Sequence, residues 1–181
     1  NNKIWIAYRF YETDDFIYSK GGLRLIDFND IDNFNDDIWY NINLNEYSNV
    51  NVWSIEVSKD DYGNEVLWVL SELGVQGYYY NIININQNNT IIDINPISDE
   101  YYFKNIIFRE DSKIRIDSNN NIWVITSNEG MRIIYNNGEI FEEVINKENF
   151  NILSDNISDI TFNNRGFAFV STDQGISVLN T

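Results

Sequence analysis

The stretch IRIDSNNNIWVITSNEGMRII, from Ile114 to Ile134, contains three short apolar segments separated by two polar linkers. Ile114 and Ile116 alternate with a polar residue, the second segment is centred on Trp123, and the third follows Gly130. Both linkers are rich in Asn, Asp, Ser and Gly, which tolerate a left-handed backbone or hydrogen-bond their own main chain. The pattern predicts three β-strands joined by two tight turns. Because one such meander cannot bury its own apolar faces, further copies are expected in the chain.

The three-stranded unit recurs, with variation in sequence and length, at three other places. Ile157 to Asn180 repeats the order of strand, turn, Phe-centred strand, turn and strand, and Val52 to Asn81 repeats it around a tryptophan. KIWIAYRF followed by GGLRLID forms a weaker copy at the N-terminus. The expected anchors of the four copies are the aromatic residues Trp5, Trp68, Trp123 and Phe169, which lie 63, 55 and 46 residues apart, and the turn glycines Gly22, Gly74, Gly130 and Gly175.

A period near fifty residues, made of short strands without helical periodicity, is typical of β-propeller blades. Fourth strands are expected in Ile38 to Leu44, Thr90 to Asn95 and Glu139 to Val144. The sequence thus predicts an all-β fold, a β-propeller fragment of about four blades of four antiparallel strands. The blades are expected at approximately 1–49, 50–97, 104–148 and 152–181, with the first and the last incomplete.

The two ends of the sequence suggest a larger assembly. The chain begins at the aromatic strand of one copy and ends after the third strand of another. Closed propellers typically have 4 to 8 blades, so the hypothesis is an internal piece of a longer propeller whose remaining blades are its partners. A piece of this kind would leave two apolar blade faces open to water.

These repeats resemble the two-component-regulator type of propeller repeat, found in extracytoplasmic sensor propellers of hybrid two-component systems and, in similar form, in propellers linked to type IX secretion. The resemblance is closest in residues 114–134 and 157–180, good in 52–81, and departs at Phe169, where tryptophan is usual. It implies a non-enzymatic recognition or scaffold module in the periplasm or at the cell surface, which senses or docks a glycan, peptide or protein. The scaffold by itself does not specify the task.

Composition excludes several classes of function. Lys plus Arg number 12 against 28 for Asp plus Glu, and the formal charge of −16 disfavours binding to nucleic acid or to anionic lipid. No apolar run is long enough to predict membrane insertion. The chain has no cysteine and no histidine, which rules out disulfides, Cys/His zinc sites and Ser-His-Asp or Cys-His catalysis. No cofactor is expected.

One linker has the beginning of a calcium-binding pattern. Asp117, Asn119 and Asn121 alternate as the first ligands of a calcium loop do. The sixth and twelfth positions of such a loop require glycine and glutamate, but here they are Ile122 and Asn128. A hairpin turn made of turn-forming residues is therefore favoured, and no metal site is predicted.

Two aromatic groups are candidates for ligand contact. Tyr11, Phe16 and Tyr18 lie in a long turn among carboxylates and could form a sugar- or peptide-binding lip. The favoured alternative is a loop that packs these rings against its own blade. In the run from Tyr78 to Tyr80, at most two side chains can share a face of the strand, and core packing is favoured over a stacking platform.

A function of a different class remains open. Carboxylates occur in adjacent pairs, as at Asp14 with Asp15 and Glu142 with Glu143. A glycosidase needs two carboxyl groups about 5 to 9.5 Å apart across a cleft, whereas neighbours in a strand point apart. A carboxylate-dependent glycan hydrolase or lyase with a propeller cleft is thus the alternative, and it predicts acidic side chains from adjacent blades converging with raised pKa values.

Overall fold

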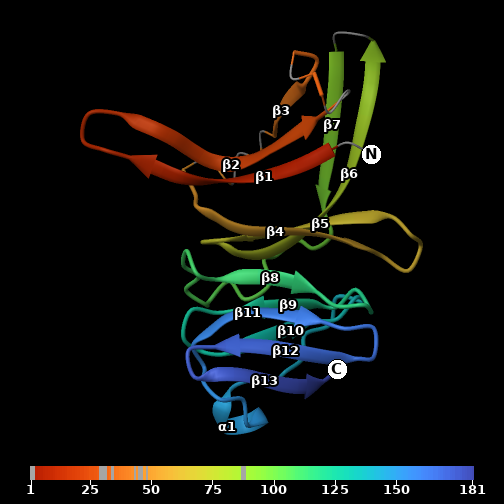
Figure 1. The fold of residues 1–181 in the computed structure, drawn as a ribbon. Helices are drawn as coiled ribbons and strands as arrows, with labels where there is room; N and C mark the ends of the chain where they lie inside the picture. Colours follow the sequence, from red (N-terminus) through yellow and green to blue (C-terminus); the bar gives the residue numbers. More distant parts are fainter. Residues whose placement is uncertain are drawn as a thin grey trace.

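Alternating apolar residues and turn-forming linkers fold into antiparallel hairpins. The computed structural model of the chain describes residues 3–28, 32, 33, 35–42, 44, 47, 49–86 and 89–181, and the side chains of 17, 18, 41, 83–86 and 89–91 lie outside that description. Within it, the strands form four antiparallel sheets that stack on one another in sequence order (Figure 1). The all-β prediction is confirmed.

Each sheet is a meander of consecutive strands. The first contains β1 (Lys3–Glu12), β2 (Ile17–Asp27) and β3 (Ile38–Ile42), and the second contains β4 (Val52–Lys59), β5 (Glu65–Ser71), β6 (Gly74–Asn86) and β7 (Asn89–Pro96). The third contains β8 (Lys113–Ile116), β9 (Ile122–Ile125) and β10 (Met131–Ile134), and the fourth contains β11 (Ile157–Phe162), β12 (Phe167–Thr172) and β13 (Gly175–Asn180). Among the described residues, only the second sheet has four strands.

The expected outer strand of the third sheet is not formed. Residues 139–145 pair with β10 only at two isolated bridges, Ile134 with Ile140 and Met131 with Ile145. The prediction of a strand from Glu139 to Val144 was wrong because two extra residues bulge away from β10 between these bridges. The bulge is compatible with burial at the end of the segment, where Ile145 enters the core.

The core lies between the sheets. β5 and β9 belong to the two middle sheets, and nearly all their side chains are buried, because each face of the strand packs on a different neighbour. In β5, Leu67 and Val69 pack toward the first sheet, whereas Trp68 and Leu70 pack toward the third. Each fully buried side chain of this kind contributes about 1.5–3 kcal/mol to stability. Continuous burial identifies the middle of a stack, since a strand with one solvated face alternates.

The side chains from Tyr78 to Tyr80 alternate between the two faces of β6 in the same way. Tyr78 and Tyr80 lie on one face of β6 and join the core between the first two sheets, whereas Tyr79 is exposed. The buried hydroxyl of Tyr78 lies 2.8 Å from that of Tyr47. Core packing, the favoured interpretation of this run, is confirmed for two of the three residues.

The turns between the first and second strands of three sheets share one device. The side-chain oxygen of the first turn residue accepts hydrogen bonds from the backbone N–H groups two and four residues later, as in an Asx turn. The acceptors are Asp60 for Tyr62 and Asn64 (2.9 and 2.8 Å), Asp117 for Asn119 and Asn121 (2.8 and 2.9 Å), and Asn163 for Arg165 and Phe167 (2.8 and 3.1 Å).

Asp117 has two further donors, which explains the calcium-like pattern. Its Oδ2 accepts from Asn121 Nδ2 (2.9 Å) and from the indole Nε1 of Trp123 (3.0 Å). The carboxylate is buried, and N–H donors supply its hydrogen bonds. The turn therefore has the hydrogen bonds of a hairpin turn, as the hairpin interpretation predicts.

The turns between the second and third strands use glycine and a hydroxyl. Gly130 has φ +82°, and a Cβ there would lie 2.3 Å from the carbonyl oxygen of Ile145, so no other residue fits without displacing the backbone. The hydroxyl of Thr126 donates to the Gly130 carbonyl (2.9 Å) and accepts from the Glu129 N–H (3.1 Å). Gly22, Gly74 and Gly175 also have positive φ, of +98°, +122° and +128°.

Helical structure is minimal in the described chain. The helix α1 (Lys147–Phe150) has four residues and is capped by Asn146, whose side chain accepts from the Asn149 N–H (2.8 Å). No helix among the described residues has the length and apolar character needed to cross a bilayer.

Candidate functional site

The four aromatic anchors occupy one position of the repeat. In each sheet, the anchor pairs with the residue three positions after the turn glycine. The pairs are Trp5 with Leu25, Trp68 with Gly77, Trp123 with Ile133 and Phe169 with Val178. The alignment of the copies therefore corresponds to a real equivalence in the strand ladders.

Three of these anchors pack against the next sheet along the chain. Trp5 joins the core between the first and second sheets, Trp68 that between the second and third, and Trp123 that between the third and fourth. The Trp123 ring, for example, lies 5.5 Å from that of Phe162 in β11. The anchor position is thus the contact from one sheet to its successor.

Phe169 differs. The prediction that Phe169 anchors its copy as the three tryptophans do was wrong, because the residue is 36% exposed while its neighbours Ala168 and Val170 face the core. The physical reason is its place in the stack: it occupies the face that would contact a following sheet, and the fourth sheet is the last in this chain.

An open apolar face surrounds Phe169. Phe167, Ile176 and Val178 are also exposed on the fourth sheet, with Val178, the ladder partner of Phe169, at 55%. We call these four residues the C-terminal face. Exposed apolar side chains grouped on one sheet mark an interaction surface more often than scattered ones do.

The first sheet carries a similar surface on its outer side. Ile4, Ile26 and Trp39 pair across β1, β2 and β3 and point away from the core formed by Trp5 and Leu25. Ile4 and Trp39 are exposed, while Ile26 between them is buried. We call these three residues the N-terminal face. Both ends of the stack thus present apolar residues where the middle sheets bury theirs.

Charged residues gather where β4, β8 and β11, the first strands of the second, third and fourth sheets, lie next to one another. Arg115 of β8 donates from Nη1 to Glu56 of β4 (3.2 Å) and from Nη2 to Asp159 of β11 (2.9 Å). Lys113 also approaches Asp159 (3.4 Å). One arginine therefore joins three consecutive sheets, and Glu56, Arg115 and Asp159 line a cavity of about 850 Å³. Phe169 of the C-terminal face lines the same cavity.

The pKa values of the two carboxyl groups in this network are shifted in opposite directions. Burial raises the pKa of Glu56 above 4.5, and the charge and hydrogen bond of Arg115 offset the effect only in part. Burial also acts to raise the pKa of Asp159, but hydrogen bonds from Arg115 and from the Ile160 N–H outweigh it, so that the pKa falls below 3.8. The difference arises because Asp159 has more donors.

Sequence reasoning missed Glu56, Arg115 and Asp159 as a group. The available signal was local: Arg115 is the polar residue between Ile114 and Ile116 in an alternating strand. Alternation indicates that its side chain leaves the core face, but it cannot say that acidic residues of two other sheets meet it there.

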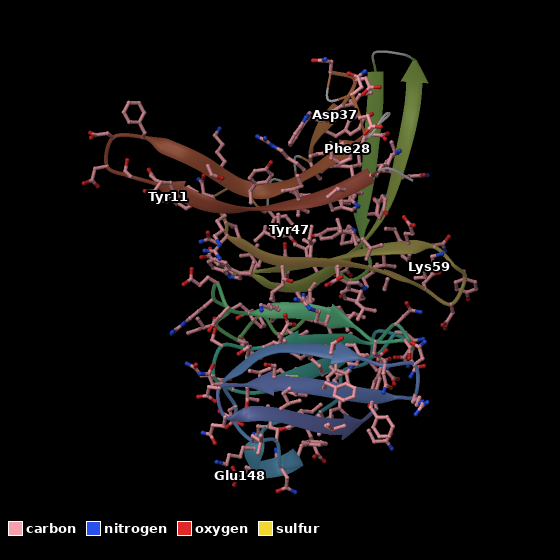
Figure 2. All side chains as sticks on the ribbon, viewed as in Figure 1. Tyr11, Phe28, Asp37, Tyr47, Lys59 and Glu148 are labelled. Atoms are coloured by element: carbon pink, nitrogen blue, oxygen red, sulfur yellow. The ribbon has the colours of Figure 1, made fainter. Side chains whose placement is uncertain are left out.

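The proposed aromatic lip lies on the long β1–β2 hairpin, which projects from the stack (Figure 2). Tyr11 and Phe16 are both exposed in large part, which leaves ring surface for a ligand, and the alternative of packing against their own blade stays open beside it. The side chain of Tyr18 is outside the described part. Neither Tyr11 nor Phe16 lines the cavity around Arg115 or the one around Arg132, and a ligand-binding role for the three residues stays a prediction.

Solved structures identify the architecture. PorZ, an essential bacterial surface component of the type IX secretion system of Porphyromonas gingivalis, superimposes with a TM-score of 0.64 at 15% identity, over 99% of this chain and 24% of that one. The chain is a β-propeller segment by fold. The extracellular domain of a putative hybrid two-component system from B. thetaiotaomicron matches with a TM-score of 0.53 at 17% identity, over 90% of this chain and 20% of that one.

The predicted resemblance to these two kinds of propeller protein is confirmed at the level of structure. Identities of 15% and 17% carry the fold only. The propeller segment spans about a quarter and a fifth of the two matched chains. No protein-family model matches the sequence, and no curated protein matches it.

Proposed function

We propose that this propeller segment is a non-enzymatic recognition and scaffold module, part of a larger extracytoplasmic β-propeller that senses or docks a ligand or a protein partner. The observation that carries the proposal is the pair of open apolar faces. The C-terminal face presents Phe169 in the position where Trp68 and Trp123 each contact the next sheet. A further blade of the same propeller is the occupant with matching geometry.

The comparisons support this proposal in two ways. Both matched proteins are much longer than this chain, which agrees with additional blades. One is a bacterial surface component and the other an extracellular domain, which agrees with an extracytoplasmic location, in the periplasm or at the cell surface. The acidic surface, with a formal charge of −16, is compatible with either a soluble ligand or a protein partner.

The reading frame that contains this segment tests the proposal. Additional repeats with an Asn-Ile-Trp-Val type of strand are expected next to it. A membrane span followed by signalling domains would then favour the sensor role, and a signal peptide with a C-terminal sorting region would favour the role in type IX secretion. A start codon and a stop codon that bracket these 181 residues would contradict the proposal.

Association in solution tests the open faces themselves. The 181-residue chain is expected to self-associate with increasing concentration, and Val178→Asp should reduce this association without lowering the melting temperature, because Val178 is exposed. Tyr62→Asp is the matched control, since Tyr62 is exposed in the β4–β5 turn, away from both faces. Sedimentation velocity measures both variants. A monomer at all concentrations, unchanged by Val178→Asp, would refute an interface at the C-terminal face.

One observation keeps an enzymatic alternative open. Glu56, whose pKa is raised, and Asp159, whose pKa is lowered, lie in one cavity on either side of Arg115. A carboxylate-dependent glycan hydrolase or lyase uses a protonated acid beside an ionised carboxylate. Against this alternative, the Arg115 guanidinium bonds to both groups and lies between them, and they belong to the second and fourth sheets rather than to adjacent ones.

Turnover of a panel of oligosaccharides separates the two functions. The recognition proposal expects no products from the wild-type chain. Products that disappear in Glu56→Gln, with folding intact by circular dichroism, would replace the proposal by the enzymatic alternative.

A further inference from the structure

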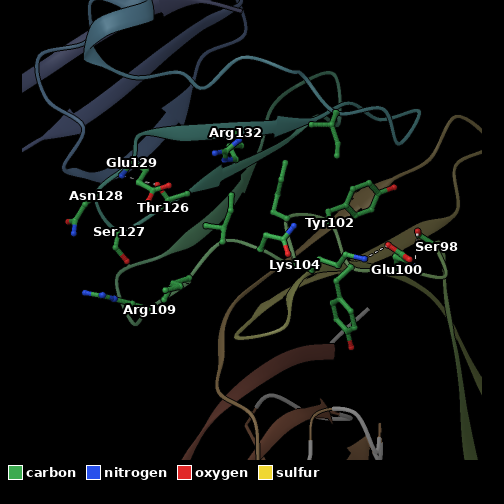
Figure 3. A pocket seen from close by; sticks show the side chains of 16 residues that line it. Ser98, Glu100, Tyr102, Lys104, Arg109, Thr126, Ser127, Asn128, Glu129 and Arg132 are labelled. Atoms are coloured by element: carbon green, nitrogen blue, oxygen red, sulfur yellow. Dashed lines mark hydrogen bonds and ion pairs between the residues drawn. The ribbon is translucent and has the colours of Figure 1, made fainter.

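We infer that the cavity between the β7–β8 connector and the β9–β10 turn binds an organic carboxylate that carries a branched aliphatic group. This cavity has a volume of about 770 Å³ and is separate from the one around Arg115. Its walls come from residues 98–109 on one side and from 126–132 on the other (Figure 3), and Ile140 also lines it. The inference deepens the proposed function, on whose recognition role it rests, by naming a ligand class.

Positive charge is concentrated in this cavity. Lys104, Arg109 and Arg132 line it together with two carboxylates, Glu100 and Glu129, so its formal charge is positive by one in a chain whose total is −16. Glu100 is paired with Lys104 at 2.5 Å. An anion that enters the cavity therefore meets the two arginines, against the charge of the surrounding surface.

Arg132 is the group best prepared for such an anion. Its guanidinium carbon lies 5.7 Å from the centre of the Phe103 ring, which holds the side chain in place. Its Nε is buried and has no hydrogen-bond partner among the described residues. Buried donors are as a rule satisfied, and a carboxylate can accept side by side from Nε and Nη of one arginine. A bound carboxylate would supply the missing acceptor.

The apolar part of the ligand follows from the rest of the lining. Ile107 is 76% exposed and Ile140 is 44% exposed, and both line the cavity. The neighbouring rings already have contacts: Tyr102 packs on Trp68 at 6.0 Å, and Phe103 lies beneath Arg132. Among the apolar side chains of the lining, the exposed ones are thus aliphatic, which fits a branched hydrocarbon group better than the polar ring of a sugar acid.

Ligand-observed saturation-transfer NMR with N-acetyl-leucine tests the inference on the full 181-residue chain. N-acetyl-leucine is expected to bind saturably, with N-acetyl-leucinamide at least tenfold weaker, because the amide lacks the charge. Acetate and glucuronate should also be weaker, since neither has the aliphatic group.

Variants locate the binding. Arg132→Gln is expected to weaken the binding of N-acetyl-leucine at least tenfold, and Arg109→Gln is expected to weaken it severalfold. Arg132→Lys should recover only part of the loss, because lysine keeps the charge but has no Nε donor. Glu129→Gln should strengthen binding severalfold by removing a like charge. Arg165→Gln, in the β11–β12 turn, is the matched control and should change nothing.

Equal binding of the acid and the amide would overturn the inference, as would wild-type affinity in folded Arg132→Gln and Arg109→Gln variants. Tighter binding of glucuronate than of N-acetyl-leucine would overturn the aliphatic assignment. Failure here is distinguishable from failure of the proposed function. Loss of carboxylate binding with Val178-dependent association intact would remove this site only, and the reverse result would remove only the end-face interface.

Discussion

Replacing Asp117 by alanine tests whether the buried carboxylate organises the β8–β9 turn. The change removes the acceptor for two backbone N–H groups, for the side chain of Asn121 and for the indole of Trp123. Trp123 is 4% exposed, so its N–H cannot turn to water without opening the core between the third and fourth sheets. Each buried donor left unsatisfied costs about 1–3 kcal/mol.

The expected loss of unfolding free energy for Asp117→Ala is about 2–6 kcal/mol, counting the indole and one turn N–H as the two donors that water cannot reach. With an unfolding entropy of about 2.1 cal/mol/K per residue, a 181-residue chain should melt roughly 5–16 °C lower. Asp117→Asn keeps one oxygen acceptor, so its melting temperature should lie between those of the wild type and Asp117→Ala. Differential scanning calorimetry measures the three melting temperatures.

Asp60 provides the matched control. It makes the same pair of backbone contacts in the β4–β5 turn, but that turn is exposed, so water can replace the carboxylate. Asp60→Ala should therefore lower the melting temperature much less than Asp117→Ala. Equal shifts in the two variants would refute the argument that burial of the Trp123 and turn donors, rather than the turn motif itself, makes Asp117 important.

Two further predictions concern a turn glycine and the charged network. Gly130→Ala should lower the melting temperature by roughly 5 °C more than Gly63→Ala. Both glycines have positive φ, but only at Gly130 does the new Cβ meet a backbone atom, the Ile145 carbonyl oxygen at 2.3 Å. Similar shifts in the two variants would contradict this steric account. The lowered pKa of Asp159 means that its ionised form stabilises the fold above pH 3.8 and that this contribution disappears as the pH falls through the folded-state pKa. Asp159→Asn should therefore melt below the wild type at neutral pH and converge with it in acid, and a difference independent of pH would show that the Arg115 contact is not electrostatic.

Much of the local structure could be predicted from the sequence. Strand alternation, Asn-rich linkers and glycines such as Gly130 report backbone preferences that act within a few residues, and those preferences survive in the folded chain. The position of Pro96 at the end of β7 follows from the same kind of rule, since proline has no N–H for the ladder. Segments whose conformation depends on distant partners were harder to predict, as the bulged segment before Ile145 illustrates.

The candidate sites depended on tertiary structure for the same reason. Arg115 becomes a link between three sheets only because Glu56 and Asp159, 59 and 44 residues away, are brought to it by stacking. The cavity around Arg132 likewise combines two connectors that are separate in the sequence. No sequence pattern indicates that the Arg132 Nε is buried without a hydrogen-bond partner among the described residues, or that Ile107 and Ile140 are exposed in the same cavity.

The sequence by itself determined the repeating unit: short strands, Asx and glycine turns, and one aromatic anchor per copy, all of which follow from local backbone chemistry and a period of two along each strand. Only the tertiary structure decided which face of each strand is covered. Trp123 is buried and Phe169 is exposed at the same register position, because burial depends on whether another sheet packs against that face, and packing between sheets is a contact between residues far apart in the chain.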